Sequence, residues 1–110
     1  MISYRSVILP GNVRVRIGYP WWLLLPRNVA AITLGRRIWI ARPLPPAELE
    51  ILLRHELEHV RQMERLGVPA FLLRYLGEYA RNRLRGMDHD AAYRAISFER
   101  EAFRAERALE

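Results

Sequence analysis

The stretch His55-Glu56-Leu57-Glu58-His59 places two histidines four residues apart, with a glutamate directly after the first. On an α-helix each residue advances about 100°, so the two imidazoles lie about 40° apart on one face and about one turn apart along the axis. Both can therefore reach one metal ion. Glu56 lies on the shoulder of that face, where it can contact a water molecule at the ion without binding the ion itself. The rest of the chain is expected to support a helix that carries these residues.

The composition fits a single domain, residues 1–110, with room for one hydrophobic core. The chain has no cysteine, which excludes disulfides and thiolate metal sites and leaves histidine and carboxylate as the strong metal ligands. The net charge of +6 comes from arginine alone, because lysine is absent. The arginines are spread along the chain without a recognition motif, so we expect no nucleic-acid partner.

The N-terminal residues predict neither a secretory signal nor a membrane span. Residues 1–9 contain one basic residue and a short apolar run that ends at Pro10 and Gly11. The apolar run 19–25 is far below spanning length. We therefore expect a cytoplasmic protein with no transmembrane segment. Trp21 and Trp22, in this run, could pack in the core or face a substrate.

Strand patterns fill the first 41 residues. Residues 5–18 alternate apolar and basic side chains around a turn at Pro10-Gly11-Asn12. Residues 29–41 predict a second hairpin, in which Gly35 supplies the backbone freedom that the turn requires. A small antiparallel sheet is therefore expected before the histidine helix.

Helix patterns fill the remainder. The first predicted helix runs from Pro46 to about Leu66, because Pro46 suits a first turn and Gly67 suits a helix end. A second helix, about 69–85, is expected to pack behind the first as scaffold. A third begins at Asp88, at Asp90 or as late as Ser97. Strands followed by three helices predict an α+β fold. The expected core stripe of the first helix is Leu49, Leu53, Leu57 and Val60, and one side of the second helix carries Leu72, Leu76, Tyr79 and Ala80.

A catalytic zinc ion commonly takes three protein ligands, so two histidines leave such a site incomplete. A metzincin would need a glycine and a third histidine where this chain has Gln62 and Arg65, which excludes that class. On a last helix, Glu99 shares an inward stripe with Ala102 and other apolar or small residues, whereas Glu101 lies on a more polar face. The candidates for the third ligand are Glu99, Glu101, Asp88, Asp90 and His89.

A carboxylate on an apolar stripe needs a partner, because burial without one costs several kcal/mol and drives the group to protonate. An arginine or a zinc ion could be that partner of Glu99, and without the histidine pair an arginine would be favoured. The histidine pair favours the metal, so the predicted ligands are His55, His59 and Glu99, with Asp90 as the next candidate.

Two stretches of the C-terminal half resemble the gluzincin-type zinc peptidases, and among them the small single-domain minigluzincins. The first stretch is His55-Glu56-Leu57-Glu58-His59-Val60-Arg61-Gln62. The second is Phe98-Glu99-Arg100-Glu101-Ala102, in which Glu99 and Ala102 match a Glu-x-x-Ala motif. Ser97 stands where relatives often carry proline, which leaves the start of the last helix open.

The resemblance implies a zincin-like fold and a zinc-dependent metalloendopeptidase. In such an enzyme Zn²⁺ is bound by His55, His59 and Glu99, and Glu56 is the general base that activates water to hydrolyse a peptide or protein substrate. The resemblance also implies that the strand at 37–41 forms the rim on which an extended peptide adds as a further strand. Latency is a feature of such small members.

Other interpretations of the same residues stay open. The domain could hold zinc only to brace its fold and act by binding a protein, in which case four protein ligands would surround the ion. Tyr75 and Tyr93 could stabilise an oxyanion or simply cap the core. Glu58 and Glu64 are expected to be surface charges, and His89 a turn residue near a helix start.

Overall fold

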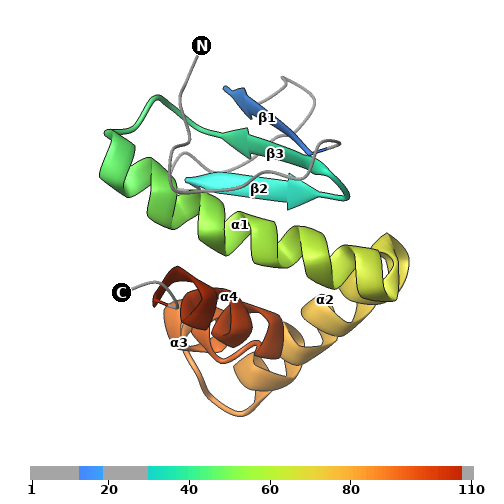
Figure 1. Ribbon diagram of the computed structural model, residues 1–110. Coiled ribbons are helices and arrows are strands. Elements are labelled where there is room, and N and C mark those ends of the chain that lie inside the picture. The colour runs from blue at the N-terminus through green and yellow to red at the C-terminus, as the bar shows by residue number, and fades with distance from the viewer. Residues whose placement is uncertain (1–12, 19–29, 108–110) are drawn as a thin grey trace.

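The computed structural model describes residues 13–18 and 30–107 (Figure 1). The predicted turn at 10–12, the strand residues before it and Trp21 and Trp22 lie outside the described residues. The described chain is α+β, with strands first and helices afterwards, as predicted. In order, the elements are β1 (Arg14–Ile17), β2 (Ala31–Leu34), β3 (Arg37–Ile40), α1 (Pro46–Leu66), α2 (Val68–Leu84), α3 (His89–Arg94) and α4 (Ser97–Arg107).

The described strands form a mixed sheet in the order β1-β3-β2. The hairpin of β2 and β3 is antiparallel, as predicted, and Gly35 in its turn has the positive φ of 62° that favours glycine. The expectation of a wholly antiparallel sheet is wrong for β1, which pairs parallel to β3. The chain between β1 and β3 covers residues 18–36, which is long enough for the crossover that a parallel pair requires.

The position of β3 corrects a second expectation. Residues 37–41 were expected to form the rim that accepts a further strand, but β3 lies between β1 and β2 and pairs with both. A strand that is paired on both sides has no free backbone edge for a peptide. Among the described strands, β2 is the edge strand on the side of β3 away from β1.

Helix α1 lies between the sheet and the other helices (Figure 1). Its predicted apolar stripe packs on the sheet, where Leu53 is fully buried together with Ile38 and Ile40. On its other side Met63 belongs to a second apolar cluster with Phe71, Ile96 and Phe98, contributed by α2 and the start of α4. Because both sides of α1 are covered, polar residues between the two clusters are buried as well.

The helix boundaries follow local sequence signals at most positions. Helix α1 spans the predicted residues and ends just before Gly67, whose N–H still bonds Met63 O at 2.7 Å and whose φ of 84° then turns the chain out of the helix. The predicted third helix is two helices in the described chain. Asp88 caps α3 by accepting from the Ala91 N–H at 2.9 Å, and α4 starts separately at Ser97.

Helix α2 buries little of the side that carries Leu72 and Leu76. Phe71 and Asn82 are its buried residues, whereas Leu72 and Leu76 are 39% and 61% exposed. No helix within residues 13–18 and 30–107 combines the length and the apolar character needed to cross a bilayer.

Candidate metal centre

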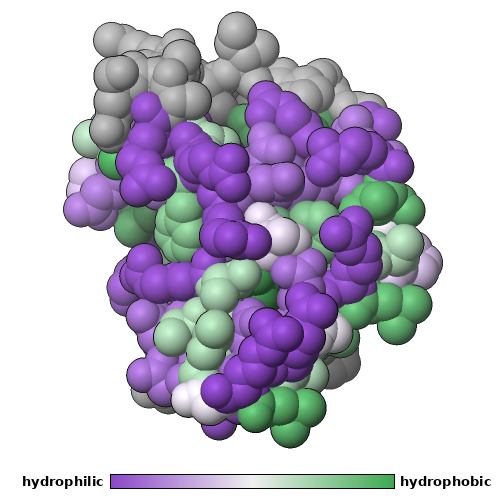
Figure 2. Space-filling model, turned by 90° about the horizontal axis from the view of Figure 1, so that it is seen from below, coloured by the Kyte–Doolittle hydropathy of each residue, from purple (hydrophilic) through white to green (hydrophobic). Residues whose placement is uncertain are grey.

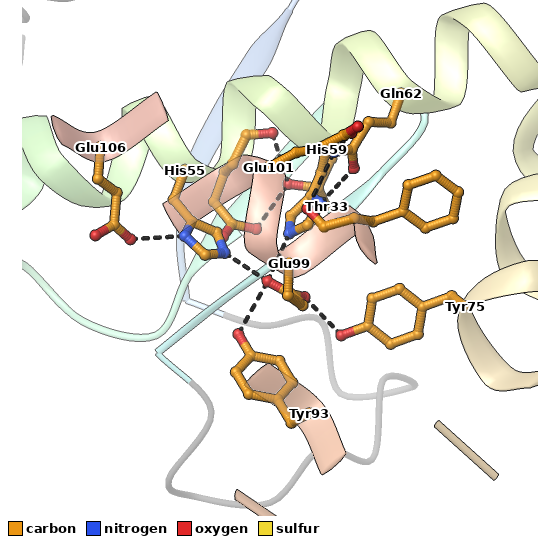
Figure 3. Close-up of polar contacts among 11 residues, drawn as sticks. Thr33, His55, His59, Gln62, Tyr75, Tyr93, Glu99, Glu101 and Glu106 are labelled. Carbon is orange, nitrogen blue, oxygen red and sulfur yellow. Dashed lines mark hydrogen bonds and ion pairs between the residues drawn. The ribbon is translucent and has the colours of Figure 1, made fainter. Parts of the chain in front are cut away.

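The structure brings His55, His59 and Glu99 together, although 40 residues separate Glu99 from the nearer histidine. The Nε2 atoms of His55 and His59 lie 2.7 and 3.1 Å from Oε1 of Glu99 (Figure 3). One ligand atom from each residue lies within 4.8 Å of the other two, and all three side chains are buried. The predicted third ligand therefore faces the histidine pair.

The side of each imidazole away from Glu99 also has a partner. Nδ1 of His55 lies 2.6 Å from Oε1 of Glu106, and Nδ1 of His59 lies 2.8 Å from Oε1 of Gln62 (Figure 3). A carboxylate oxygen and an amide oxygen only accept hydrogen bonds, so both Nδ1 atoms must donate. This leaves the Nε2 atoms of both rings to meet whatever binds beside Glu99.

The orientation of the Gln62 amide follows from its other contacts. Its Nε2 donates to the Phe98 carbonyl at 3.0 Å and to Oε1 of Glu101 at 2.9 Å. Those two bonds use both amide protons, so the amide oxygen faces His59. Gln62 is fully buried and joins α1 to the first turn of α4.

Two phenols complete the surroundings of Glu99. The hydroxyl of Tyr75 donates to Oε2 at 2.6 Å, and that of Tyr93 donates to Oε1 at 3.2 Å. Burial and the charge of Glu99 raise the pKa of both phenols, so each keeps the proton it donates. Helix α2 is therefore more than the scaffold that was expected, because it supplies Tyr75 to this cluster.

The electrostatics of the cluster fit a bound cation. Burial alone would raise the pKa of Glu99, but contacts with His55 and His59 hold that pKa well below its ordinary value. Burial alone would lower the pKa of His59, but the hydrogen bond and charge of Glu99 outweigh it and raise that pKa to about 9. Without a metal, each Nε2···Oε1 contact needs a proton on an imidazole whose Nδ1 is already a donor. A cation beside Glu99 replaces those protons and leaves the Nδ1 contacts unchanged.

Glu56 is buried beside the cluster. One of its carboxylate oxygens accepts from the Thr33 hydroxyl of β2 at 2.8 Å. Burial is the main reason that its pKa is raised above the ordinary value of 4.5, and the nearby histidines and Thr33 oppose that shift. A carboxylate whose pKa is moved towards neutrality is suited to take up and release a proton.

The other candidates for the third ligand have different partners. Glu101 accepts from Gln62 and lies 3.8 Å from Arg65, and Asp90 pairs with Arg94 at 3.1 Å. Asp88 caps α3, where His89 is the first residue and its Nδ1 lies 2.8 Å from the Tyr79 hydroxyl. Glu58 and Glu64 form ion pairs with Arg61 and Arg36; Glu64 is exposed, as expected of a surface charge, whereas Glu58 is half-buried.

Several residues that shape the site were not singled out from the sequence as site residues. Gln62 served to exclude the metzincins and closed the first stretch of the resemblance, and Glu106 was not considered as a site residue. Helical phase could have indicated Glu106, since it lies two turns beyond Glu99 on the same stripe. No local pattern indicates that Thr33 reaches Glu56 or that Glu78 holds the start of α4, because both contacts join distant segments.

Comparison of the chain with protein-family models, with curated proteins and with solved structures gives no match.

Proposed function

We propose that this protein is a zinc-dependent metallopeptidase of the gluzincin type. The observation that carries the proposal is the meeting of His55 Nε2, His59 Nε2 and a Glu99 carboxylate oxygen within 4.8 Å, on the buried His-Glu-x-x-His face in the middle of α1. Two imidazoles and one carboxylate are a ligand set typical of catalytic zinc. A closed structural zinc site would require a fourth protein ligand. Among the described residues no further histidine, cysteine or carboxylate joins these three.

When bound, zinc would polarise the scissile carbonyl and lower the pKa of a water molecule. The chain's own residues would perform the remaining steps. Glu56 would take a proton from the attacking water while the water oxygen bonds to the carbonyl carbon. It would then give that proton to the amine as the C–N bond breaks. Thr33 would hold the Glu56 carboxylate in place through its hydroxyl.

Glu56 also separates this proposal from another use of the same ligands. Two histidines and one carboxylate can bind iron(II) in oxygenases. Those reactions need no general base beside the metal, whereas here a buried carboxylate with a raised pKa adjoins the three ligands. The combination favours hydrolysis.

A substrate peptide would bind along β2. This strand lies at an edge of the described sheet, and its Thr33 contacts Glu56. An extended peptide that paired with the β2 backbone would therefore pass beside the general base. We therefore propose β2 as the strand that pairs with substrate, in place of β3, which is paired on both sides.

The proposal is tested by metal analysis together with one substitution. The purified protein should contain one zinc ion per chain, and His59→Ala and Glu99→Ala should lose it. Glu56→Gln should keep the zinc and cleave unfolded proteins at least about 100-fold more slowly, because the amide cannot accept the proton. Glu58→Gln is the matched control, since Glu58 belongs to the same helix but pairs with exposed Arg61.

Three results would count against the proposal. Protein that binds iron and no zinc would overturn the choice of metal. Cleavage by Glu56→Gln at the wild-type rate would overturn the mechanism. Zinc bound by wild-type protein that cleaves no peptide, even after limited proteolysis to relieve latency, would point to the non-catalytic zinc-stabilised domain.

A further inference from the structure

The outer side of α2 carries a leucine stripe, defined as Leu72, Leu73, Leu76 and Leu84, that the described residues leave exposed. These side chains are 39%, 75%, 61% and 88% exposed. Seven large apolar side chains are exposed in the described chain, and the four of the stripe all come from this one helix. Leucines gathered in this way mark an interaction surface rather than the scattered apolar residues of an ordinary exterior.

The leucine stripe and the metal centre use opposite sides of α2. With about 100° per residue, Leu73, Leu76 and Leu84 fall within about 80° of one another, and Leu72 lies at the margin of the stripe, about 100° from Leu73. Tyr75, which donates to Glu99, lies about 160° from the direction of Leu73. A partner on the stripe would therefore leave the Tyr75 contact in place.

Three arginines line one flank of the leucine stripe, and the other flank carries Leu72 in the first turns of the helix and Arg83 near its end. Around the helix axis, Arg74, Arg81 and Arg85 point about 80–120° from the direction of Leu73. Arg83 points about 80° from Leu73 in the opposite sense. All four are exposed, and Arg74 stacks over Phe98 at 5.2 Å. The single acid of the helix, Glu78, is engaged by the N–H and hydroxyl of Ser97.

These charges argue against a second copy of the chain as the partner. In an antiparallel pair of α2 helices, the flank with three arginines would face the same flank of the partner. In a parallel pair it would face the flank with Arg83. Neither arrangement supplies an acid, so the surface fits a partner that is apolar and anionic.

We propose that α2 docks on the surface of an anionic lipid bilayer. The leucines would enter the boundary between headgroups and acyl chains, and the arginines on both sides would reach lipid phosphates. Helix α2 lies at the edge of the described molecule (Figure 1), so that leucines exposed along this one helix form a ridge. A bilayer accepts such a ridge and supplies negative charge on both sides of it, whereas a protein would need a groove with two acidic walls.

The distribution of hydrophobic residues over the surface supports this choice. In Figure 2, hydrophobic side chains gather at the right-hand edge, the end at which α1 passes into α2, and hydrophilic ones cover most of the remainder. The proposal is independent of the metal centre and of its chemistry, because none of the stripe residues contacts the three candidate ligands.

The test is co-sedimentation of the whole chain with vesicles. We expect binding to phosphatidylcholine vesicles that contain phosphatidylserine, weaker binding as salt is added, and none to phosphatidylcholine alone. The variant Leu73→Gln with Leu76→Gln should bind at least about tenfold more weakly, because it buries less apolar surface in the bilayer. The variant Arg81→Gln with Arg83→Gln should lose about fivefold for each charge.

Matched controls separate this surface from the general charge of the protein. Ile51→Gln removes an apolar side chain of α1 that is 42% exposed, and Arg42→Gln removes an exposed arginine before α1. Both should bind like wild type. Circular dichroism and thermal unfolding establish that each variant is folded before it is compared.

Three results would overturn the proposal. The first is no binding to anionic vesicles at low salt. The second is binding that the leucine variant retains in full, which would place the contact elsewhere. The third is a wild-type dimer that the leucine variant converts to monomer while neither binds vesicles, which would identify a second copy as the partner.

Discussion

At the scale of single residues, the histidines differ in the partner that holds each ring. Glu106 offers His55 a carboxylate, whereas Gln62 offers His59 a neutral amide oxygen. A charged acceptor strengthens the hydrogen bond and makes the opposite nitrogen of the ring a better ligand. His55 is therefore expected to be the stronger of the two imidazole ligands, and Glu106 a positioning residue for it.

This difference predicts the effect of removing Glu106. Glu106→Ala should bind zinc about 10–100-fold more weakly, because the ring of His55 loses the acceptor that orients it. Glu106→Gln should recover most of the affinity, since an amide oxygen can still accept from Nδ1. Competition with a coloured chelator measures both.

Glu64→Ala, which removes a surface carboxylate paired with Arg36, is the control and should bind as wild type does. Unchanged affinity in Glu106→Ala would show that the 2.6 Å contact does not support the ligand.

At the scale of elements, the start of α4 depends on α2. Glu78 accepts from the Ser97 N–H at 2.8 Å and from its hydroxyl at 2.7 Å, while the Ile96 carbonyl accepts the first backbone bond of α4. A carboxylate at the positive end of a helix is favourable, and this one fixes where α4 begins. The phase of Glu99, two residues after Ser97, follows from that start.

The pKa of Glu78 gives this contact a pH dependence. Partial burial would raise that pKa, but the hydrogen bonds from Ser97 and the nearby Arg74 and Arg81 lower it below its ordinary value of 4.5. A pKa lowered by folding stabilises the protein above the unfolded value, and the stabilisation is lost as pH falls through the folded value. Glu78→Gln should therefore be less stable by about 0.5–1 kcal/mol at neutral pH.

Urea unfolding of wild type and Glu78→Gln, at neutral pH and again below pH 4.5, measures this difference. We expect the difference in unfolding free energy between the two proteins to be smaller below pH 4.5 than at neutral pH. The same comparison with Glu58→Gln, which lacks a helix start as partner, should give little difference at either pH. A loss of stability in Glu78→Gln that is the same at both pH values would contradict the assignment.

At the scale of the whole molecule, α1 is the element on which both apolar clusters meet. The sheet packs on one side through Ile38 and Ile40, and α2 and α4 pack on the other through Phe71 and Phe98. The metal centre joins α1 to α4 between these clusters. A bound ion should therefore stabilise the whole fold.

This arrangement predicts a stability that depends on zinc. With free zinc at about 100 times the dissociation constant, the free energy of unfolding should rise by about 2.7 kcal/mol. That corresponds to an increase in Tm of roughly 10 °C for a domain of this size. Differential scanning calorimetry after chelation and after zinc addition measures it.

His59→Ala serves as the control and should show no zinc-dependent rise in Tm. An equal rise in that variant would mean that zinc acts somewhere other than at the three predicted ligands.

The sequence predicted what local patterns determine. Pro46 and Gly67 bound α1 correctly, and helical phase placed Glu99 on the inward side of α4. The parallel pairing of β1 with β3 was missed, because it depends on a contact across a long connection. The contacts of Thr33 and Glu78 were missed for the same reason. The exposure of one side of α2 could not be predicted, because periodicity shows that leucines share a face without showing what covers it.

The separation of 40 residues between His59 and Glu99 has a consequence for the protein during its synthesis. A nascent chain can form α1, with both imidazoles on one turn, before the segment that carries Glu99 has left the ribosome. Such a chain has two of the three ligands and lacks the carboxylate that balances the charge of the ion. If the cluster binds zinc as proposed, full metal loading would begin only after α4 has been made and has packed against α1, and so would any hydrolysis that depends on the metal.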